Sequence, residues 1–343
     1  MTSRQSHRKD EHVSLAKKFH SDVSQAGFQA LRLLPNALPE SDFTNVSLKT
    51  TFGKLALELP FYIEAMTGGS SFTKKLNQQL AHVAAETGLA MAVGSESVAL
   101  KDPTLRDSFS IVRKVNPHGL IFANLSAGAS LDECHAALEL VQGDALELHL
   151  NAAQEAIMPE GDRSFHWAEH LQANVAASPV PVILKEVGFG MTQETMLTLR
   201  SLGVQYLNLG GHGGTNFAQI ENFRRPQKDF DYLTDWGLTT VESLYEAHAV
   251  PDMYIAAAGG ITNPLEIVKA LYLGADAVGV AGTLLTYLID HDVNATIELV
   301  REWITGLRTI FALLGVHSIA ELRQRPAVLS SELLTYLQQR NLS

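Results

Sequence analysis

The chain has 343 residues, 46% of them hydrophobic, which is enough to build the core of one large globular domain. Its formal net charge of −11 argues against a broad nucleic-acid surface, and no uncharged apolar run is long enough to predict a membrane-spanning helix. The single cysteine excludes an intrachain disulfide, and the polar N-terminus has no apolar signal-peptide core, so we expect a cytoplasmic protein.

The first sixty residues predict an arm followed by a lead-in. Residues 1–20 carry mixed charges and few large apolar side chains, a composition that predicts an exposed arm. Within it, the cluster Arg8-Lys9-Asp10-Glu11-His12 is, on composition alone, a solvated segment. Residues 28–60 are punctuated by proline and glycine, which predicts short strands or turns before the regular part of the fold.

From Phe61 onward, short apolar runs alternate with helical patterns. One helix, for example, begins at Ser130 with Glu133 completing a capping box, and its apolar face makes Cys134 a core residue. Strands are expected over residues 61–66, 89–93, 119–124, 145–150, 181–186, 204–209, 252–258 and 276–280. This alternation predicts an α/β fold, a TIM (β/α)8 barrel, in preference to an open doubly wound sheet.

Two loops of small residues follow the last two expected strands, Gly259-Gly260 and Ala281-Gly282. The helix after the first loop has Asn263 as its N-cap and Pro264 in its first turn. Backbone N–H groups at such helix starts bind phosphate, and a phosphate site commonly lies after strands 7 and 8 of this barrel. We therefore expect a phosphate group to bind here.

The sequence after the barrel, residues 291–343, has apolar spacings that predict helices. No linker is long enough to divide the chain. We therefore expect a single domain, with an N-terminal arm and lead-in over residues 1–60, the barrel over residues 61–290 and the C-terminal helices after it.

Function in a TIM barrel gathers at the carboxyl ends of the strands. The polar residues expected there are Thr67, Ser95, Asn124, His149, Asn151, Gln154, Glu155, Lys185, Glu186, His212 and Thr215. Of these, Thr67 could instead cap a helix, and His149 could be an interior histidine with its hydrogen bonds satisfied. Lys185 favours function more strongly, because a lysine in the barrel mouth needs an anionic or electron-rich partner.

An ordered set of short motifs runs from the arm to the eighth strand. It consists of Arg8-Lys9 with Glu11-His12, Ala65-Met66-Thr67-Gly68-Gly69, His149-Leu150-Asn151 with Gln154-Glu155, Lys185-Glu186-Val187-Gly188, Gly213-Gly214-Thr215 with Glu221, and Gly259-Gly260. This set resembles the type 2 isopentenyl diphosphate isomerases. The resemblance implies an FMN-dependent, Mg²⁺-requiring enzyme of isoprenoid biosynthesis. Such an enzyme interconverts isopentenyl and dimethylallyl diphosphate by a 1,3-proton shift, and it is active only with reduced flavin.

The resemblance also implies roles for residues that would meet the substrate. Arg8 and Lys9 would hold the diphosphate, aided by His149 and Asn151. Gln154 would contact the substrate as a catalytic residue. These assignments are carried over by position in the matching motifs.

For the metal and the flavin, the resemblance implies that Glu155 helps to place Mg²⁺ and that Lys185 stabilises the anionic reduced ring. NADPH would reduce the flavin. The other positions implied to line or hold FMN are Ala65, Met66, Thr67, Ser95, Asn124, Thr215, Gly259, Gly260, Ala281 and Gly282. Two positions depart from the family's usual pattern, since Glu96 stands for glutamine and Thr262 for arginine, and their contacts are not carried over. The family forms tetramers or octamers, so a homo-oligomer is implied.

Three other functions remain open from the residues alone. An FMN-dependent 2-hydroxy acid oxidase would share the barrel, but it uses an arginine where Thr215 stands. A barrel like inosine monophosphate dehydrogenase would need a loop cysteine, whereas Cys134 is expected on a helix. A non-catalytic barrel that binds a phosphorylated ligand would leave Gln154, Glu155 and Lys185 without roles.

Overall fold

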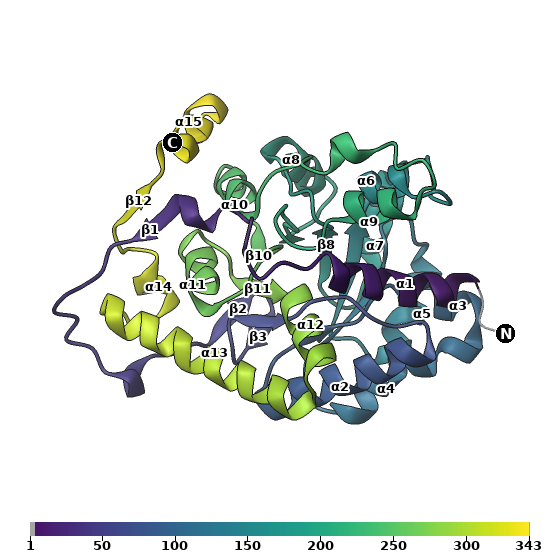
Figure 1. The fold of residues 1–343 in the computed structure, drawn as a ribbon, viewed down its shortest axis with the longest axis horizontal. Coiled ribbons are helices and arrows are strands. Elements are labelled where there is room, and N and C mark those ends of the chain that lie inside the picture. Colours follow the sequence, from purple (N-terminus) through teal and green to yellow (C-terminus); the bar gives the residue numbers. More distant parts are fainter. Residues whose placement is uncertain (1–3, 343) are drawn as a thin grey trace.

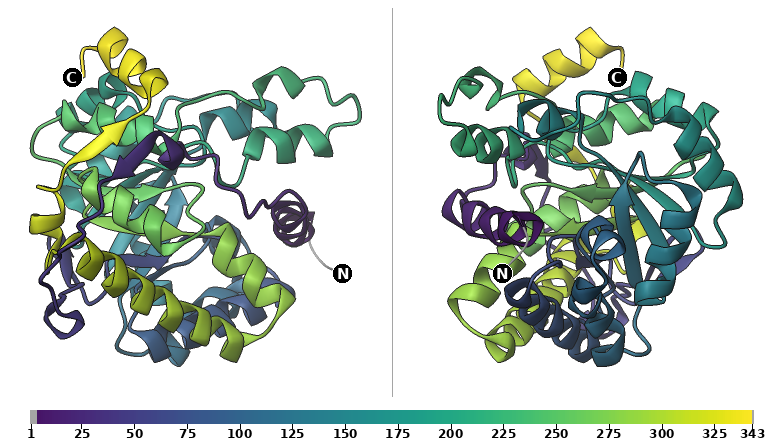
Figure 2. Two further views of the ribbon diagram at one scale, coloured as in Figure 1. Left: turned by 60° about the vertical axis from the view of Figure 1, so that its left-hand side comes forward. Right: turned by 90° about the vertical axis from the view of Figure 1, so that its right-hand side faces the viewer.

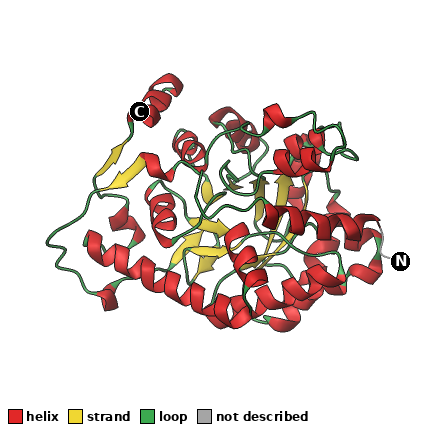
Figure 3. Cartoon of the chain, in the orientation of Figure 1, coloured by secondary structure: helices red, strands yellow, loops and turns green. Residues whose placement is uncertain are grey.

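The computed structural model describes residues 4–342, and its centre is a closed barrel of eight parallel strands (Figures 1 and 3). The barrel strands are β4 Phe61–Ile63, β5 Met91–Ala92, β6 Ile121–Ser126, β7 Ala145–Leu150, β8 Val182–Glu186, β9 Tyr206–Asn208, β10 Tyr254–Ala258 and β11 Ala277–Val280. The barrel closes where β11 pairs with β4 in parallel. The predicted TIM barrel is confirmed, and each observed strand overlaps its expected range.

Helices surround the strands (Figure 3). They are α2 Ser71–Thr87, α3 Ser97–Lys101, α4 Asp107–Val115, α5 Leu131–Val141, α6 Ala152–Ile157, α7 Ala168–Ala177, α8 Gln193–Ser201, α9 Phe217–Arg224, α10 Thr240–His248, α11 Pro264–Tyr272, α12 Gly282–Asp290 and α13 Val293–Leu314. Their caps follow the sequence signals. Ser130 and Glu133 form the predicted capping box of α5, and Asn263 accepts from the backbone N–H of Glu266 at the start of α11. Cys134 is buried, as predicted.

Alternate residues of the strands point into the barrel and form two layers. The lower layer is apolar and includes Phe122, Ala145, Ile183, Tyr206 and Ala256. The upper layer is nearer the carboxyl ends of the strands, and its buried polar side chains are Glu64, Asn124, Glu147, Lys185 and Asn208. Burying polar groups costs free energy unless they are paired. Because this layer lies next to the carboxyl ends of the strands, we expect it to support a functional site there.

The amino end of the barrel is covered by the hairpin of β2 Thr50–Phe52 and β3 Leu55–Leu57. The ring of Phe52 packs edge to face on Tyr206, with ring centroids 5.4 Å apart. The hydroxyl of Thr50 donates to the carbonyl of Asp276, just before β11, at 3.0 Å. This end is therefore closed by apolar packing, and the site lies at the opposite end.

The N-terminal segment corrects one expectation, because residues 4–18 form a helix, α1 Arg4–Lys18, rather than an exposed arm. Val13 and Leu15 are buried, and α1 contacts α2, α9 and α12. In Figure 1 it lies in front of the barrel strands, and Figure 2 shows it end-on beside the barrel. The mixed charges of this segment predicted exposure to solvent, but several of them form ion pairs with the rest of the protein, as Glu11 does with Arg224 at 2.9 Å.

The C-terminal segment contains α14 Ile319–Leu322 and α15 Ser331–Arg340, but also a strand that the helical expectation missed. This strand, β12 Ala327–Leu329, pairs antiparallel with β1 Leu31–Leu33. Three residues are too few for a pattern, and their partner lies at the other end of the chain. No helix in the described residues is both long and apolar enough to cross a membrane.

Candidate functional site

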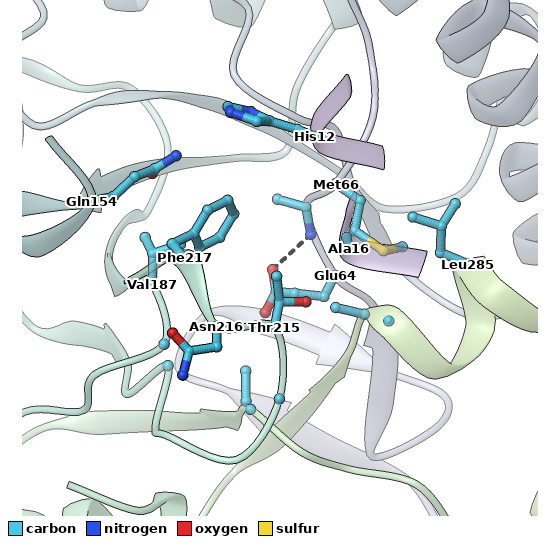
Figure 4. Close-up of a pocket in the computed structure, with 18 of the residues that line it drawn as sticks. His12, Ala16, Glu64, Met66, Gln154, Val187, Thr215, Asn216, Phe217 and Leu285 are labelled. Carbon is cyan, nitrogen blue, oxygen red and sulfur yellow. Dashed lines mark hydrogen bonds between the residues drawn. The ribbon is translucent and has the colours of Figure 1, made fainter. Parts of the chain in front are cut away.

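A cavity of about 610 Å³ opens at the carboxyl ends of the barrel strands, within the size range of cofactor and ligand sites. Most residues that the sequence predicts for the site line this cavity: Arg8, Lys9, Ala65, Met66, Ser95, Asn124, His149, Asn151, Gln154, Glu155, Lys185, Thr215, Gly259, Gly260, Ala281 and Gly282. Figure 4 shows Gln154 and Phe217 on one side of the view, with Met66 and Leu285 on the other. The fold thus brings together residues from α1 and from loops throughout the barrel.

Thr67 is placed differently from the other predicted residues. Its side chain is buried, and its hydroxyl donates to Asn77 Oδ1 on α2 rather than lining the cavity. Its carbonyl accepts from the backbone N–H of Gly94 at 2.8 Å, which ties the first loop to the second. A contact between Thr67 and the flavin stays a prediction.

The small-residue loops after β10 and β11 share one corner of the cavity. Gly259 and Gly260 have φ values of 101° and 70°, a region that favours glycine, and a Cβ on Gly259 would overlap the carbonyl oxygen of Gly211. The first-turn N–H groups of α12 have no partners within the helix. A Cβ on Gly282, where α12 begins, would lie 3.7 Å from Thr215 Oγ1. Backbone donors and a hydroxyl therefore converge where a phosphate can bind.

Lys185 finds its anionic partner within the protein. Its Nζ lies 3.2 Å from Glu64 Oε2, and the two side chains are 8% and 3% exposed. Glu64 also accepts from Asn208 Nδ2 at 2.6 Å. A Cβ at position 279 would overlap Glu64 Oε2, so Gly279 on β11 makes room for this carboxylate. Lys185 is held at the cavity floor with its charge compensated.

Glu64 is a functional candidate that the sequence analysis missed. It was treated as part of the first strand because it follows an apolar run. The available signal was the strand period of two, since Tyr62 and Glu64 share the inward face with the ends of the other strands. The Tyr62 hydroxyl donates to Glu64 Oε2 at 3.2 Å, which confirms the shared face.

A hydrogen-bonded chain joins β6 and β7 beneath the cavity. Asn124 Nδ2 donates to Glu147 Oε2 at 3.0 Å, and His149 Nδ1 lies 2.9 Å from Asn124 Oδ1. Burial, together with the charges of Lys9 and Lys185, lowers the pKa of His149 to about 3. In the unliganded protein His149 is therefore a neutral imidazole.

Two cations reach the cavity from α1. Arg8 Nη1 lies 3.7 Å from Glu160 Oε1, and Lys9 Nζ donates to the carbonyl of Ser95 at 3.2 Å. Burial and the neighbouring Arg8 guanidinium lower the pKa of Lys9 to about 8. Because the protein as a whole is acidic, these local cations make the cavity suitable for an anionic ligand.

Asn151, Gln154 and Glu155 lie together at the start of α6. Asn151 Nδ2 donates to Gln154 Oε1 at 3.2 Å and to Glu155 Oε1 at 3.1 Å. Glu155 Oε2 accepts from the backbone N–H of Asp162 at 2.8 Å. No group of three or more His, Cys, Asp or Glu side chains within residues 4–342 could hold a metal ion. A metal at Glu155 would thus need ligand atoms from a bound molecule.

Gln154 is oriented by a buried carboxylate. Its Nε2 donates to Glu221 Oε1 at 3.0 Å, and His12 Nε2 lies 3.0 Å from the same oxygen. Arg224 donates to Glu221 Oε2 at 2.6 Å. Burial opposes ionisation, but these partners outweigh it and lower the pKa of Glu221. Glu221 and His12 belong to the motifs named above, but no role in the site was predicted for either residue.

The two positions that depart from the family pattern make contacts within the protein. Glu96 is buried and its Oε2 accepts from the backbone N–H of Asn124 at 2.9 Å. Thr262 lines the cavity, but its hydroxyl donates to Glu266 Oε2 at 3.0 Å. Thr262 is too short to supply the cationic group of an arginine, whereas Glu96 has the length of a glutamine but lacks its amide donor.

The geometry also bears on the alternative enzymes. Thr215 lines the cavity, and at this position there is no arginine to bind a carboxylate as expected for an oxidase. Burial raises the pKa of Cys134 to about 12, and this thiol lies on α5. A buried thiol of this kind is a poor nucleophile. The structure therefore gives no support to a cysteine-dependent dehydrogenase.

Comparison with known proteins reveals both close relatives and distant structural neighbours. The family model of FMN-dependent dehydrogenases matches residues 97–329. Among solved structures, a mutant flavocytochrome b2 with pyruvate bound is 18% identical with a TM-score of 0.68, covering 94% of this chain and 84% of that one. A mandelate oxidase mutant with (S)-mandelic acid is 16% identical with a TM-score of 0.65, covering 93% and 94%. At these identities the likeness shows the fold alone.

Curated relatives are far closer in sequence. The isopentenyl-diphosphate delta-isomerase of Latilactobacillus sakei is 51% identical over 99% of this chain and 97% of its own. That of Lacticaseibacillus casei is 49% identical over 99% and 98%, and that of Listeria monocytogenes serotype 4a is 46% identical over 95% and 92%. The chain therefore belongs to the isopentenyl-diphosphate delta-isomerases, on an FMN-dependent dehydrogenase barrel.

Proposed function

We propose that this protein interconverts isopentenyl diphosphate and dimethylallyl diphosphate, using reduced FMN and Mg²⁺. One observation carries the proposal. A single cavity contains three features. They are the cations Arg8 and Lys9 from α1, the small-residue loops after β10 and β11 where a phosphate can bind, and the Gln154–Glu155 pair on α6. A binder of one phosphorylated ligand would need only one of the two anion sites.

The cavity fits FMN on features of this chain. Gly259, Gly260 and Gly282 leave space and backbone donors for the flavin phosphate, and Lys185 lies at the floor where it can face the ring. Reduced FMN, when bound, would supply a proton donor and acceptor beside the alkene. Lys185, held by Glu64, would stabilise negative charge on the ring.

The diphosphate end of the substrate would meet residues from three elements. Arg8 and Lys9 supply positive charge, while His149 and Asn151 lie on the facing strand and loop. Glu155 would hold Mg²⁺ together with substrate phosphate oxygens, because this ion keeps waters and rarely relies on protein ligands alone. The alkene itself has no carbonyl that could stabilise a carbanion, so a cation-like path is favoured. Gln154, which donates a hydrogen bond to Glu221, would contact the reacting end.

The test of this proposal counts reductant against product. Under anaerobic conditions with FMN and Mg²⁺, one reduction should support many turnovers, and dithionite should replace NADPH. An oxidase or dehydrogenase would instead consume one NADPH or reduce one flavin for each product. Stoichiometric NADPH loss, or full activity with oxidised FMN, would contradict the isomerase function.

Glu155→Gln tests the metal assignment. The substitution removes the charge but nearly keeps the shape, so activity should fall and the Mg²⁺ concentration for half-maximal rate should rise roughly tenfold or more. The measurement is a Mg²⁺ titration of the isomerisation rate. A Mg²⁺ requirement identical to that of the unmodified enzyme would rule out Glu155 as a ligand.

We also infer from family membership that the protein is a homo-oligomer, a tetramer or an octamer, that works in the cytoplasm with NADPH as reductant. Light scattering on the purified protein measures the first of these properties. A monomer at micromolar concentration would contradict it.

A further inference from the structure

Glu147 is a buried carboxyl that the proposed chemistry does not use. It lies on β7 two residues before His149, so both side chains point into the barrel. It is fully buried, and the carboxylate of Glu64, just after β4, and the ammonium of Lys185, on β8, act on it. Burying a carboxyl group beneath a ligand site costs folding free energy, which suggests that Glu147 has a function there.

The contacts of Glu147 point toward His149. Asn124 lies between them, donating through Nδ2 to Glu147 Oε2 at 3.0 Å and facing His149 Nδ1 with its Oδ1 at 2.9 Å. An amide oxygen can only accept and an amide nitrogen can only donate. With Nδ2 committed to Glu147, the Asn124 oxygen must receive the proton of His149 Nδ1. The Leu125 carbonyl also bonds the imidazole and raises its pKa against the larger effect of burial, and no side-chain hydrogen bond within residues 7–342 involves the other ring nitrogen, Nε2, of this cavity-lining residue.

We propose that Glu147 is a positioning residue. By holding the amide of Asn124, it keeps the Nδ1–H of His149 hydrogen-bonded to the protein, so that Nε2 is available to bind the anionic end of the substrate. This inference rests on the proposed function, in which His149 meets the diphosphate. Glu147 touches neither substrate nor cofactor. It acts by fixing an amide that would otherwise be free to rotate and offer its NH₂ group to the histidine.

The surrounding charges explain why the ring must be oriented in advance. The charges of Lys9 on α1 and Lys185 on β8 act on His149, and together with burial they keep its imidazole neutral before a ligand binds. A bound diphosphate reverses this local field, so the ring can take a proton on Nε2 and donate it to a phosphate oxygen. If the Asn124 amide were rotated, its NH₂ would face a protonated Nδ1, and the cationic ring would be disfavoured.

Glu147 performs this role as an acceptor, whether or not it is ionised. Burial and the Glu64 charge raise its pKa to about 8, against the opposing charge of Lys185. Its Oε1 accepts no hydrogen bond from the described residues, and a hydrogen bond with the Glu64 carboxyl favours the protonated form, so a proton can reside on Glu147 while Oε2 still accepts from Asn124. A glutamine at this position can accept in the same way.

The experiment measures the affinity of FMN-loaded enzyme for inorganic diphosphate by calorimetry. Glu147→Gln should keep the affinity within about twofold, whereas Glu147→Leu should weaken it about tenfold, with the flavin spectrum and FMN affinity retained. If the leucine variant does not fold, Glu147→Thr, which is too short to reach Asn124, should show the same loss. Glu96→Gln is the matched control, because it replaces a second buried carboxyl by an amide of the same size, and that carboxyl bonds only the backbone of Asn124.

A double-variant cycle separates positioning from general damage. In a His149→Gln background, Glu147→Leu should cost no further diphosphate affinity. An equal loss in both backgrounds, or no loss in either, would overturn the proposal. Failure of the unmodified enzyme to isomerise isopentenyl diphosphate would contradict the proposed function, but the diphosphate measurements would still test Glu147.

Discussion

At the scale of single residues, this protein uses pairing to keep charged groups buried beside a cavity. Lys185 and Glu64 compensate each other on the floor of the site, and Glu221 is neutralised by donors from three elements. Such pairs contribute little net stability against an apolar alternative. Their value here is that they hold charge in a fixed place for a ligand.

Lys185→Ala should therefore reduce both folding stability and flavin affinity. It leaves Glu64 buried without its cation, and breaking a buried pair typically costs about 3–5 kcal/mol. Adding Glu64→Gln should recover most of the free energy of unfolding but not the isomerase activity. Denaturant unfolding and FMN titration measure the two effects. Equal stability of the single and double variants would show that Glu64 does not depend on Lys185.

Lys9 should give the empty site a pH dependence on the alkaline side. Its pKa is lowered to about 8, so it loses its charge as pH rises through that value, and affinity for diphosphate should fall. Lys9→Arg stays charged in this range, so its decline should begin at higher pH. The measurement is diphosphate affinity of both proteins between about pH 7 and pH 10. Parallel curves would assign the decline to another group.

At the scale of elements, the N-terminal segment, which its composition predicts to be an exposed arm, forms helix α1 and one wall of the site. Its Glu11 is fixed by Arg224, Lys17 pairs with Asp290 on α12, and Val13 packs into the core. These anchors lie on the helix beside the two cations that face the cavity. Docking of α1 therefore brings the positive charges of Arg8 and Lys9 to the cavity.

Replacing both Arg8 and Lys9 by alanine should raise the substrate KM strongly while FMN stays bound. Charge-assisted hydrogen bonds are worth roughly 1.5–3 kcal/mol each, so losing both should change KM by at least tenfold. A matched control replaces Lys75 and Arg308, which are exposed on α2 and α13 and do not line the cavity. If the two double variants have the same KM, α1 plays no part in substrate binding.

At the scale of the whole molecule, the C-terminal segment is tied to the outside of the barrel. β1 and β12 pair, and α15 docks through Arg340. Its guanidinium donates to Glu246 Oε1 at 2.7 Å and also contacts Glu194. The Glu246 side chain is 0% exposed, so this contact from the C-terminal helix pairs a buried charge of α10.

Arg340→Ala should lower the free energy of unfolding by about 1–3 kcal/mol, because Glu246 loses a charged partner while buried. FMN content and KM should not change, since α15 is remote from the cavity lining. Thermal or denaturant unfolding measures the effect. Arg301→Ala, which removes an exposed pair with Glu298, serves as the control and should cost less than about 1 kcal/mol.

Local physics in the sequence was enough to specify the barrel and most of the residues around its mouth. Each strand is a short apolar run, helices such as α5 and α11 begin at side-chain caps, and glycines mark where β10 and β11 end. These signals depend on neighbours along the chain. Because parallel strands all end at the same rim, the polar residues that follow them were predicted to converge, and all but Thr67 line one cavity.

The tertiary structure alone decided what depends on distant partners. The helix of residues 4–18 forms a wall because Glu11 meets Arg224, and β12 exists because β1 is beside it. The strand period places Glu64 and Glu147 on inward faces, but only the closed barrel showed that their partners are Lys185 and Asn124. A buried charge is tolerated when its partner is near, and no local pattern encodes a partner that lies dozens to hundreds of residues away.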